Sequence, residues 1–179
     1  YERCIEVFLL ACLLHDVGHA PFSHTGEEYY LKSGERVELH KRLSELTGDS
    51  NLEEEISQKS YKAAPHELMS AIVAIECFGD IIGDDKEKSF FARCITGYQY
   101  VMDEDEKYKI LNCVISLLNS SVIDVDKLDY LIRDAYITGF DTINIDYERL
   151  LRSIYIKKDL VKREADYEVV YTKGAISVI

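Results

Sequence analysis

The sequence predicts a mainly α-helical domain with a small β-hairpin near its C-terminus. Apolar residues recur at helical spacing along most of the chain, whereas β-branched and aromatic residues gather in a strand-like pattern only over residues 153–173. The length of 179 residues suits one domain, and the apolar share of 47% supplies material for a core. We therefore expect a single domain over residues 1–179, to which the hairpin is a small appendage.

Helices in the first part of the chain are predicted on either side of the Gly-Pro-containing segment that follows residue 14. Residues 2–14 form a helix, because four apolar residues share one of its faces: Ile5, Phe8, Leu9 and Cys12. A short helix is expected over residues 23–32, with Ser23 as its cap. Residues 33–64 are polar and irregular, which is typical of a mobile loop or of short helices, and we expect residues 41–62 to be a mobile insertion.

The rest of the chain is predicted to be helical up to the hairpin. Pro65 starts a helix, since the N–H that it lacks has no helical acceptor there, and Gly79 ends it. The sequence pattern predicts further helices over residues 86–96, 104–120, 125–137 and 145–152. The two strands of the hairpin are expected within residues 153–161 and 167–172.

Charge and composition narrow the choice of partners and setting. The net charge of -12 argues against a basic groove for nucleic acid, although a small anionic substrate can still bind beside a metal ion. The longest apolar run, Val7 to Leu14, is too short to cross a membrane. Five cysteines lie among apolar residues without CxxC spacing, which indicates buried reduced thiols and a cytoplasmic setting. The chain starts without Met and in mid-helix, so we expect a fragment of a longer protein. The sequence is compatible with a homo-oligomer.

The segment from His15 to His24 is the strongest candidate site. Its ligand-capable residues are His15, Asp16, His19 and His24. An adjacent imidazole and carboxylate offer a nitrogen and an oxygen to one ion, and such sets suit Zn, Fe, Mn, Co or Ni. Gly18 and Pro21 end the helix soon after this pair, so the two later histidines are expected on a turn beside the metal. The alternative is that these histidines are core residues whose hydrogen bonds are satisfied inside the protein. Four ligand-capable side chains within ten residues favour a site.

A second dense stretch, residues 120–134, carries carboxylates on a predicted helix. Spacings of three, four and seven to eight residues place one set on a single face: Asp126, Tyr130, Arg133 and Asp134. The alternative is a solvated face with ion pairs such as Asp129 with Arg133. We prefer a site, because the acidic residues lie among aliphatic neighbours and a metal at the first stretch needs another carboxylate.

These motifs resemble the HD-domain phosphohydrolases, and within them the deoxynucleoside triphosphate triphosphohydrolases. The motifs that carry the resemblance lie, in the family's order, at residues 15–19, 21–24, 65–67 and 124–134. The resemblance implies an HD-domain helical bundle with a bound divalent metal ion, which can be Mn, Fe, Zn, Ni, Co or Mg. The implied metal ligands in this sequence are His15, Asp16 and Asp126. The first ligand histidine of the family lies upstream of the His-Asp pair, and no histidine precedes His15 here.

The resemblance also implies roles for the residues around the metal. The residues implied to line the catalytic cleft are His19, His24, Glu27, His66 and Glu67, with Glu27 orienting the catalytic His24. The residues implied to touch phosphate or sugar are Lys127, Tyr130 and Asp134. His40 matches no motif, and we interpret it as a surface histidine.

The implied reaction is hydrolysis of a dNTP to deoxynucleoside and triphosphate, with a nucleotide as the substrate and no membrane involved. Other enzymes of the superfamily act on other nucleotides or phosphoesters. A stringent-response-type hydrolase would carry Glu-Asp soon after His-Asp, a cyclic-dinucleotide phosphodiesterase would carry Gly-Tyr-Pro, and neither is present. A non-catalytic nucleotide-binding or scaffold domain is the remaining alternative. The incomplete ligand set favours it, and the set of cleft histidines argues against it.

Overall fold

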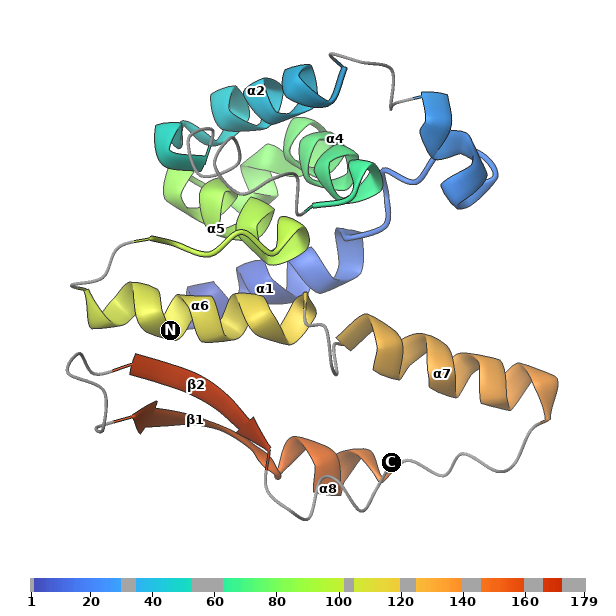
Figure 1. The fold of residues 1–179 in the computed structure, drawn as a ribbon, viewed down its shortest axis with the longest axis vertical. Helices are drawn as coiled ribbons and strands as arrows, with labels where there is room; N and C mark the ends of the chain where they lie inside the picture. The colour runs from blue at the N-terminus through green and yellow to red at the C-terminus, as the bar shows by residue number, and fades with distance from the viewer. Residues whose placement is uncertain are drawn as a thin grey trace. The chain divides into compact units, whose positions relative to one another are not determined.

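The computed structural model describes residues 2–29, 35–52, 63–101, 105–119, 125–139, 146–159 and 166–171. The chain forms two compact units, Tyr1–Val101 and Met102–Ile179, and Figure 1 shows the elements of each. The described residues are mainly helical, and one antiparallel hairpin lies near the C-terminus. The predicted fold class is therefore confirmed.

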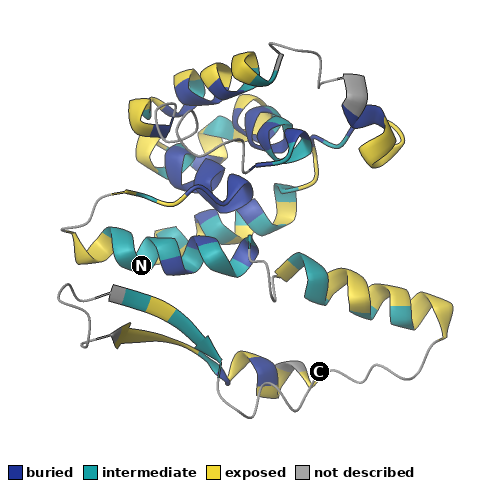
Figure 2. Ribbon diagram, viewed as in Figure 1, coloured by how far each residue is buried: buried dark blue, intermediate teal, exposed yellow. Residues whose placement is uncertain are grey.

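The first unit is built around its last helix. Its elements are α1 (Glu2–Leu14), the 3-10 helix η1 (Ser23–Tyr29), α2 (Glu35–Thr47), α4 (Pro65–Ile82) and α5 (Asp85–Thr96). Helix α5 packs against α1, α2 and α4, and every residue from Ser89 to Thr96 is buried, as the dark blue of α5 in Figure 2 shows. Apolar side chains on all sides of α5 explain this central position. Asp84 caps the helix by accepting the N–H of Glu87 at 2.9 Å.

A buried ion pair fixes the end of α5 to the segment after α2. The guanidinium of Arg93 is 1% exposed, and its Nη2 lies 2.9 Å from Oδ2 of Asp49. The same oxygen accepts the hydroxyl of Ser89 at 2.6 Å, and Arg93 also donates to the carbonyl of Gln99 at 2.9 Å. The ring of Tyr100 covers the guanidinium at 4.2 Å. These contacts satisfy charges that burial would otherwise destabilise.

Helix α2 lies in the segment for which a mobile loop and short helices were both left open, and residues 35–47 are helical. One face of α2 is buried against α4 and α5, and it includes His40, Leu43, Ser44 and Thr47. The buried hydroxyl of Thr47 donates to the carbonyl of Leu43 at 2.9 Å, which lets a polar side chain occupy the core. His40 is 4% exposed, so its interpretation as a surface histidine is wrong. Residues 53–62 lie outside the described residues, and the mobility of the insertion stays a prediction.

Helices α1 and α4 differ from their predictions in detail. In α1 the buried residues are Val7 and Ala11, whereas Ile5 and Leu9 of the predicted apolar face are exposed. Helix α4 does not end at Gly79. The backbone kinks at Phe78 (φ -128°, ψ 17°), and the helix continues to Ile82.

The second unit combines helices with the hairpin. Its elements are α6 (Glu106–Leu118), α7 (Val125–Thr138), α8 (Tyr147–Leu151), β1 (Ile154–Asp159) and β2 (Asp166–Tyr171). The strands are antiparallel, with Ile154 opposite Tyr171, and β2 packs against α6. Glu106 on α6 accepts hydrogen bonds from Lys158, at 2.5 Å, and from the hydroxyl of Tyr167. This carboxylate therefore links the helix to both strands of the hairpin.

All five cysteines are free thiols, which agrees with the prediction of reduced cysteines. Cys77 is exposed, however, so the prediction that all of them are buried is wrong at this position.

Within the described ranges, no helix has both the length and the apolar character needed to cross a membrane.

Candidate active site

The His-Asp pair lies on a tight turn at the end of α1. The N–H of Val17 donates to the carbonyl of Leu14 at 3.3 Å, and the N–H of His19 donates to that of Asp16 at 3.2 Å. The turn presses against α4 at Gly18, whose N–H donates to the Ser70 hydroxyl at 2.9 Å. A Cβ at Gly18 would lie 2.2 Å from the backbone nitrogen of Ser70, so only glycine allows this approach. Ser70 was not predicted as a site residue, because a serine on an apolar helix gives no signal of this role.

The imidazole of His15 is oriented by its own helix. Its Nδ1 lies 2.9 Å from the carbonyl of Cys12, so this nitrogen carries the proton and donates it. That bond turns Nε2 toward the Asp16 carboxylate, 3.5 Å away. Metal-binding histidines commonly donate the second ring N–H to a backbone carbonyl in this way. The nitrogen and oxygen donors therefore suit a divalent ion at His15 and Asp16.

The carboxylate of Asp16 also faces a second imidazole. Its Oδ1 lies 3.4 Å from Nε2 of His19, and the Asp16 side chain is 56% exposed. His19 thus links the His-Asp pair to the other histidines of the first unit.

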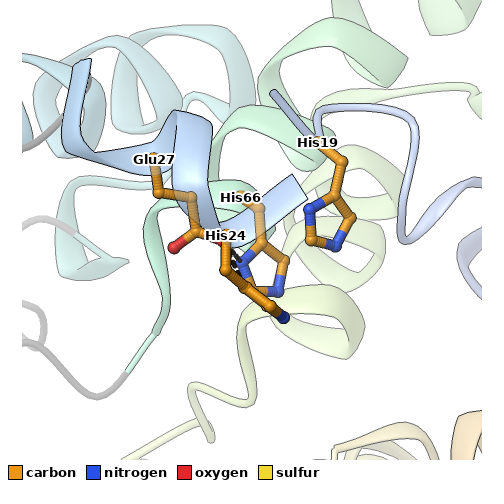
Figure 3. Close-up of side chains that lie close together, drawn as sticks. All are labelled: His19, His24, Glu27 and His66. Atoms are coloured by element: carbon orange, nitrogen blue, oxygen red, sulfur yellow. Dashed lines mark hydrogen bonds and ion pairs between the residues drawn. The ribbon is translucent and has the colours of Figure 1, made fainter. Parts of the chain in front are cut away.

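Three imidazoles and one carboxylate form a cluster beside this turn (Figure 3). We call His19, His24, Glu27 and His66 the histidine cluster. The Oε1 atom of Glu27 lies 2.7 Å from Nδ1 of His24 and 2.7 Å from Nδ1 of His66, and a single carboxylate oxygen therefore serves both rings. The ring of His19 stacks on that of His66 at a centroid distance of 4.2 Å. The predicted contact of Glu27 with His24 is present, and the contact with His66 is a further one.

The electrostatics of the histidine cluster favour an ionised Glu27. Burial alone would raise the pKa of Glu27, but hydrogen bonds from His24 and His66 outweigh it and hold the pKa below its usual value. The carboxylate can then only accept, so both rings carry their proton on Nδ1 and present Nε2 to a substrate. Burial, followed by the nearby His66, lowers the pKa of His19.

A strained loop presents His24. Phe22 and Ser23 have φ values of 69° and 54°, in the left-handed region that side chains with a Cβ rarely adopt. The loop folds back on η1 at Gly26, where a Cβ would lie 2.3 Å from the carbonyl oxygen of Pro21. The ring of His24 is left 74% exposed, within reach of an incoming molecule.

Glu67 makes a capping contact. Its carboxylate accepts the N–H of Ala64 at 2.6 Å, at the start of the helix that also carries His66. This contact fixes the first turn of α4, and a catalytic role for Glu67 stays a prediction.

The other predicted site residues lie on α7 in the second unit. They are Asp126, Lys127, Tyr130 and Asp134. Asp126 stands in the first turn of α7, and Asp134 is exposed. The alternative ion pair between Asp129 and Arg133 is present on this helix, and both side chains are exposed. The part of these four residues in the metal and phosphate site stays a prediction.

Comparison with known proteins identifies the family. A family model described as the HD domain matches residues 3–133. The chain is similar to the uncharacterized protein MG461 of Mycoplasma genitalium, at 26% identity over 97% of this chain and 33% of that protein. It is similar to the uncharacterized protein YwfO of Bacillus subtilis, at 28% identity over 87% of this chain and 27% of that protein. It is also similar to the deoxynucleoside triphosphate triphosphohydrolase SAMHD1 of Gallus gallus, at 31% identity over 83% of this chain and 23% of that enzyme.

This chain spans a third or less of the length of these relatives. No solved structure matches it. The HD-domain match nevertheless covers most of the chain and includes the His-Asp turn, the histidine cluster and Asp126. The chain therefore belongs to the HD-domain family, which includes metal-dependent phosphohydrolases.

Proposed function

We propose that this chain carries the catalytic residues of a metal-dependent phosphohydrolase that converts a dNTP into deoxynucleoside and triphosphate. The observation that carries the proposal is the Glu27 oxygen shared by His24 and His66, beside the His-Asp pair. Membership of the HD-domain family supports a metal-dependent hydrolase. The relatives named as deoxynucleoside triphosphate triphosphohydrolases support the finer choice of substrate.

The donor set of the His-Asp turn suits a divalent metal ion. His15 and Asp16 would hold the ion, and the resemblance implies Asp126 as a third ligand. When bound, such an ion polarises a phosphate oxygen and lowers the pKa of a coordinated water. Nitrogen and oxygen donors suit Mn, Fe, Zn, Ni or Co, and Mg remains compatible with the carboxylates.

His24 is the proposed group for proton transfer. Glu27 holds its Nδ1–H, so Nε2 points away from the carboxylate and is the atom that can exchange a proton. The ring is exposed enough to reach a nucleotide. As water forms a bond to phosphorus and the bond from phosphorus to the 5′ oxygen breaks, Nε2 would take a proton from the water and give it to the 5′ oxygen. A positioned carboxylate behind an imidazole fixes its orientation, as catalytic histidines require.

His66 and His19 are proposed to bind the phosphates. The His66 side chain is only 16% exposed, and Glu27 and the stacked His19 ring hold it in place. With a proton on Nε2 as well as on Nδ1, the His66 ring would be a fixed donor that stabilises charge developing on phosphate oxygens without having to reorganise. We further propose that Lys127, Tyr130 and Asp134 contact phosphate or sugar, as the resemblance implies.

The test is product analysis with the full-length protein. Purified protein would be incubated with each dNTP, the corresponding ribonucleotides, a cyclic dinucleotide and a simple phosphomonoester, and the products separated by ion-exchange chromatography. We expect deoxynucleoside and triphosphate in equal amounts, together with bound metal detected by mass spectrometry. Release of phosphate or pyrophosphate would indicate another phosphohydrolase activity. Nucleotide binding without any product would indicate the non-catalytic alternative.

A further inference from the structure

The histidine cluster holds more donor atoms than proton transfer and phosphate binding need. One ligand atom from each of His19, His24, Glu27 and His66 lies within 4.8 Å of the others. Three imidazole nitrogens and one carboxylate oxygen are a donor set typical of a four-coordinate zinc ion. All four residues belong to the first unit and are separate from the His15 and Asp16 pair.

We propose that the histidine cluster binds one Zn²⁺ ion when no substrate is present, and that zinc bound there inhibits the enzyme. The binding claim stands on the geometry of the cluster alone. The inhibition claim rests on the proposed function, because it requires a reaction to inhibit.

The distances within the cluster are close to those that zinc needs. Zinc binds nitrogen and oxygen at about 2.0–2.2 Å, which places the ligand atoms of a tetrahedral site about 3.4 Å apart. The Glu27 oxygen is already 2.7 Å from the nearest nitrogens of His24 and His66. Small side-chain rotations would therefore form the site. His24 can make the largest of them, since its ring is 74% exposed.

One nitrogen of the cluster is buried without a hydrogen-bond partner among the described residues. This atom is Nδ1 of His19. A buried polar atom without a partner is destabilising, and coordination to a metal ion would relieve that cost.

The negative charge of Glu27 also favours the binding of a cation in the histidine cluster. Its carboxylate is buried, 9% exposed, and its partners in the cluster are imidazoles. A divalent ion would replace the two ring protons that now face this oxygen. The single proton of each neutral ring would then lie on Nε2 instead of Nδ1. Zinc binding therefore requires a change of tautomer but no net loss of protons from these rings.

Zinc in the histidine cluster and a reacting nucleotide exclude each other. Zinc bound to Nδ1 of His24 would leave Nε2 protonated, so Nε2 could not take up a proton from the attacking water. The ion would also hold the imidazoles that are proposed to bind phosphate. Excess zinc should therefore inhibit in competition with the substrate.

The binding test uses metal-stripped full-length protein titrated with zinc chloride in a calorimeter. The key variant is His24→Gln, chosen because an exposed side chain can be replaced with little risk to the fold. We expect wild-type protein to bind one more zinc ion than His24→Gln, or to bind that ion at least tenfold more tightly. Glu38→Gln, which changes an exposed glutamate on α2, is the matched control and should behave as wild type.

A second variant separates the cluster from the His-Asp pair. Asp16→Asn removes a ligand of the pair and should retain the zinc ion of the cluster, whereas Asp16→Asn with His24→Gln should lose it. The proposal fails if His24→Gln binds zinc with the stoichiometry and affinity of wild type. It also fails if a folded Asp16→Asn variant binds no zinc. If Asp16→Asn does not fold by circular dichroism, the comparison of His24→Gln with wild type decides alone.

The inhibition test adds zinc to an assay that contains the enzyme's own activating metal. We expect the apparent KM for the nucleotide to rise with zinc while kcat stays constant. Inhibition that lowers kcat without changing KM would contradict competition at the cluster. An absence of any hydrolysis would refute the proposed function, and the calorimetric result would still decide whether the zinc site exists.

Discussion

The imidazole of His19 stacks on that of His66, with centroids 4.2 Å apart and ring planes inclined by 13°. The two rings come from the turn after α1 and from the first turn of α4. Their parallel arrangement depends on how closely the turn approaches α4, and Gly18 sets that approach. The packing of one glycine therefore controls the geometry of the histidine cluster.

Gly18→Ala should separate the turn from α4. The new Cβ would meet backbone atoms that cannot move aside, so we expect the free energy of unfolding to fall by roughly 1–3 kcal/mol or more. Urea unfolding followed by circular dichroism would measure the change. The control is Gly79→Ala on α4, where the nearest atom is the flexible end of Lys88 at 3.4 Å. This control should be neutral or stabilise by roughly 0.4–1 kcal/mol, and equal losses in both variants would contradict our explanation.

Arg93→Met should be strongly destabilising, because it leaves the Asp49 carboxylate partly buried without its cation. Breaking one side of a buried ion pair costs roughly 3–5 kcal/mol. Arg152→Met is the matched control, since Arg152 pairs with Glu148 at the surface, where both side chains are more than 80% exposed. The control should change the free energy of unfolding by about 0.5 kcal/mol or less. Similar values for the two variants in urea titrations would show that the buried pair contributes little.

His40 should make the protein less stable in mild acid. Burial, followed by the charge of Arg36, lowers the pKa of His40 from 6.5 to about 4. At pH 7 the ring is neutral in both states and has no effect. Below pH 6.5 the unfolded chain binds a proton that the folded chain does not. The free energy of unfolding should then fall by up to about 1.4 kcal/mol per pH unit until the pH nears 4.

A comparison of wild type with His40→Leu isolates this effect from the other titrating groups. The difference in free energy of unfolding between the two proteins should change steadily between pH 7.5 and 4.5, with wild type losing more. A difference that is constant across this range would show that His40 titrates normally in the folded state.

His24→Ala distinguishes a catalytic histidine from a structural one. In full-length protein that holds only its activating metal and no added zinc, we expect a content of that metal near that of wild type and hydrolysis slower by about a hundredfold or more. Asp126→Ala should lose both metal and activity if Asp126 is a ligand. Metal analysis, melting temperature and dNTP turnover would be measured for both variants. A lower melting temperature with unchanged turnover in His24→Ala would remove His24 from the mechanism and point to His66 instead.

The helical periodicity predicted most elements of the fold but not all of their buried faces. Helix α6 (Glu106–Leu118) lies within its predicted range, and the strands Ile154–Asp159 and Asp166–Tyr171 lie close to theirs. Helix α2 was left open because polar residues that bond to their own backbone, such as Thr47, share its buried face with Leu43. In α4, Gly79 is a weak signal for a helix end, and Gly83, with φ 116°, is the residue at the actual end.

The candidate site was predicted from motifs, and its internal contacts were not. Spacing brings His24 and Glu27 together, since they are three positions apart on η1. No local pattern shows that Glu27 also binds His66, because that contact depends on how η1 packs beside α4. The bond between Gly18 and Ser70 was beyond prediction for the same reason: it joins two segments that are far apart in the chain.

The left-handed backbone at Phe22 and Ser23 has a consequence for engineering. Glycine at either position would remove a steric penalty of about 1–2 kcal/mol, so a screen for heat resistance should enrich it. The same replacement would widen the range of conformations open to the segment that presents His24, and turnover would decline. Thermal selection and catalytic selection would thus pull these two positions toward different residues.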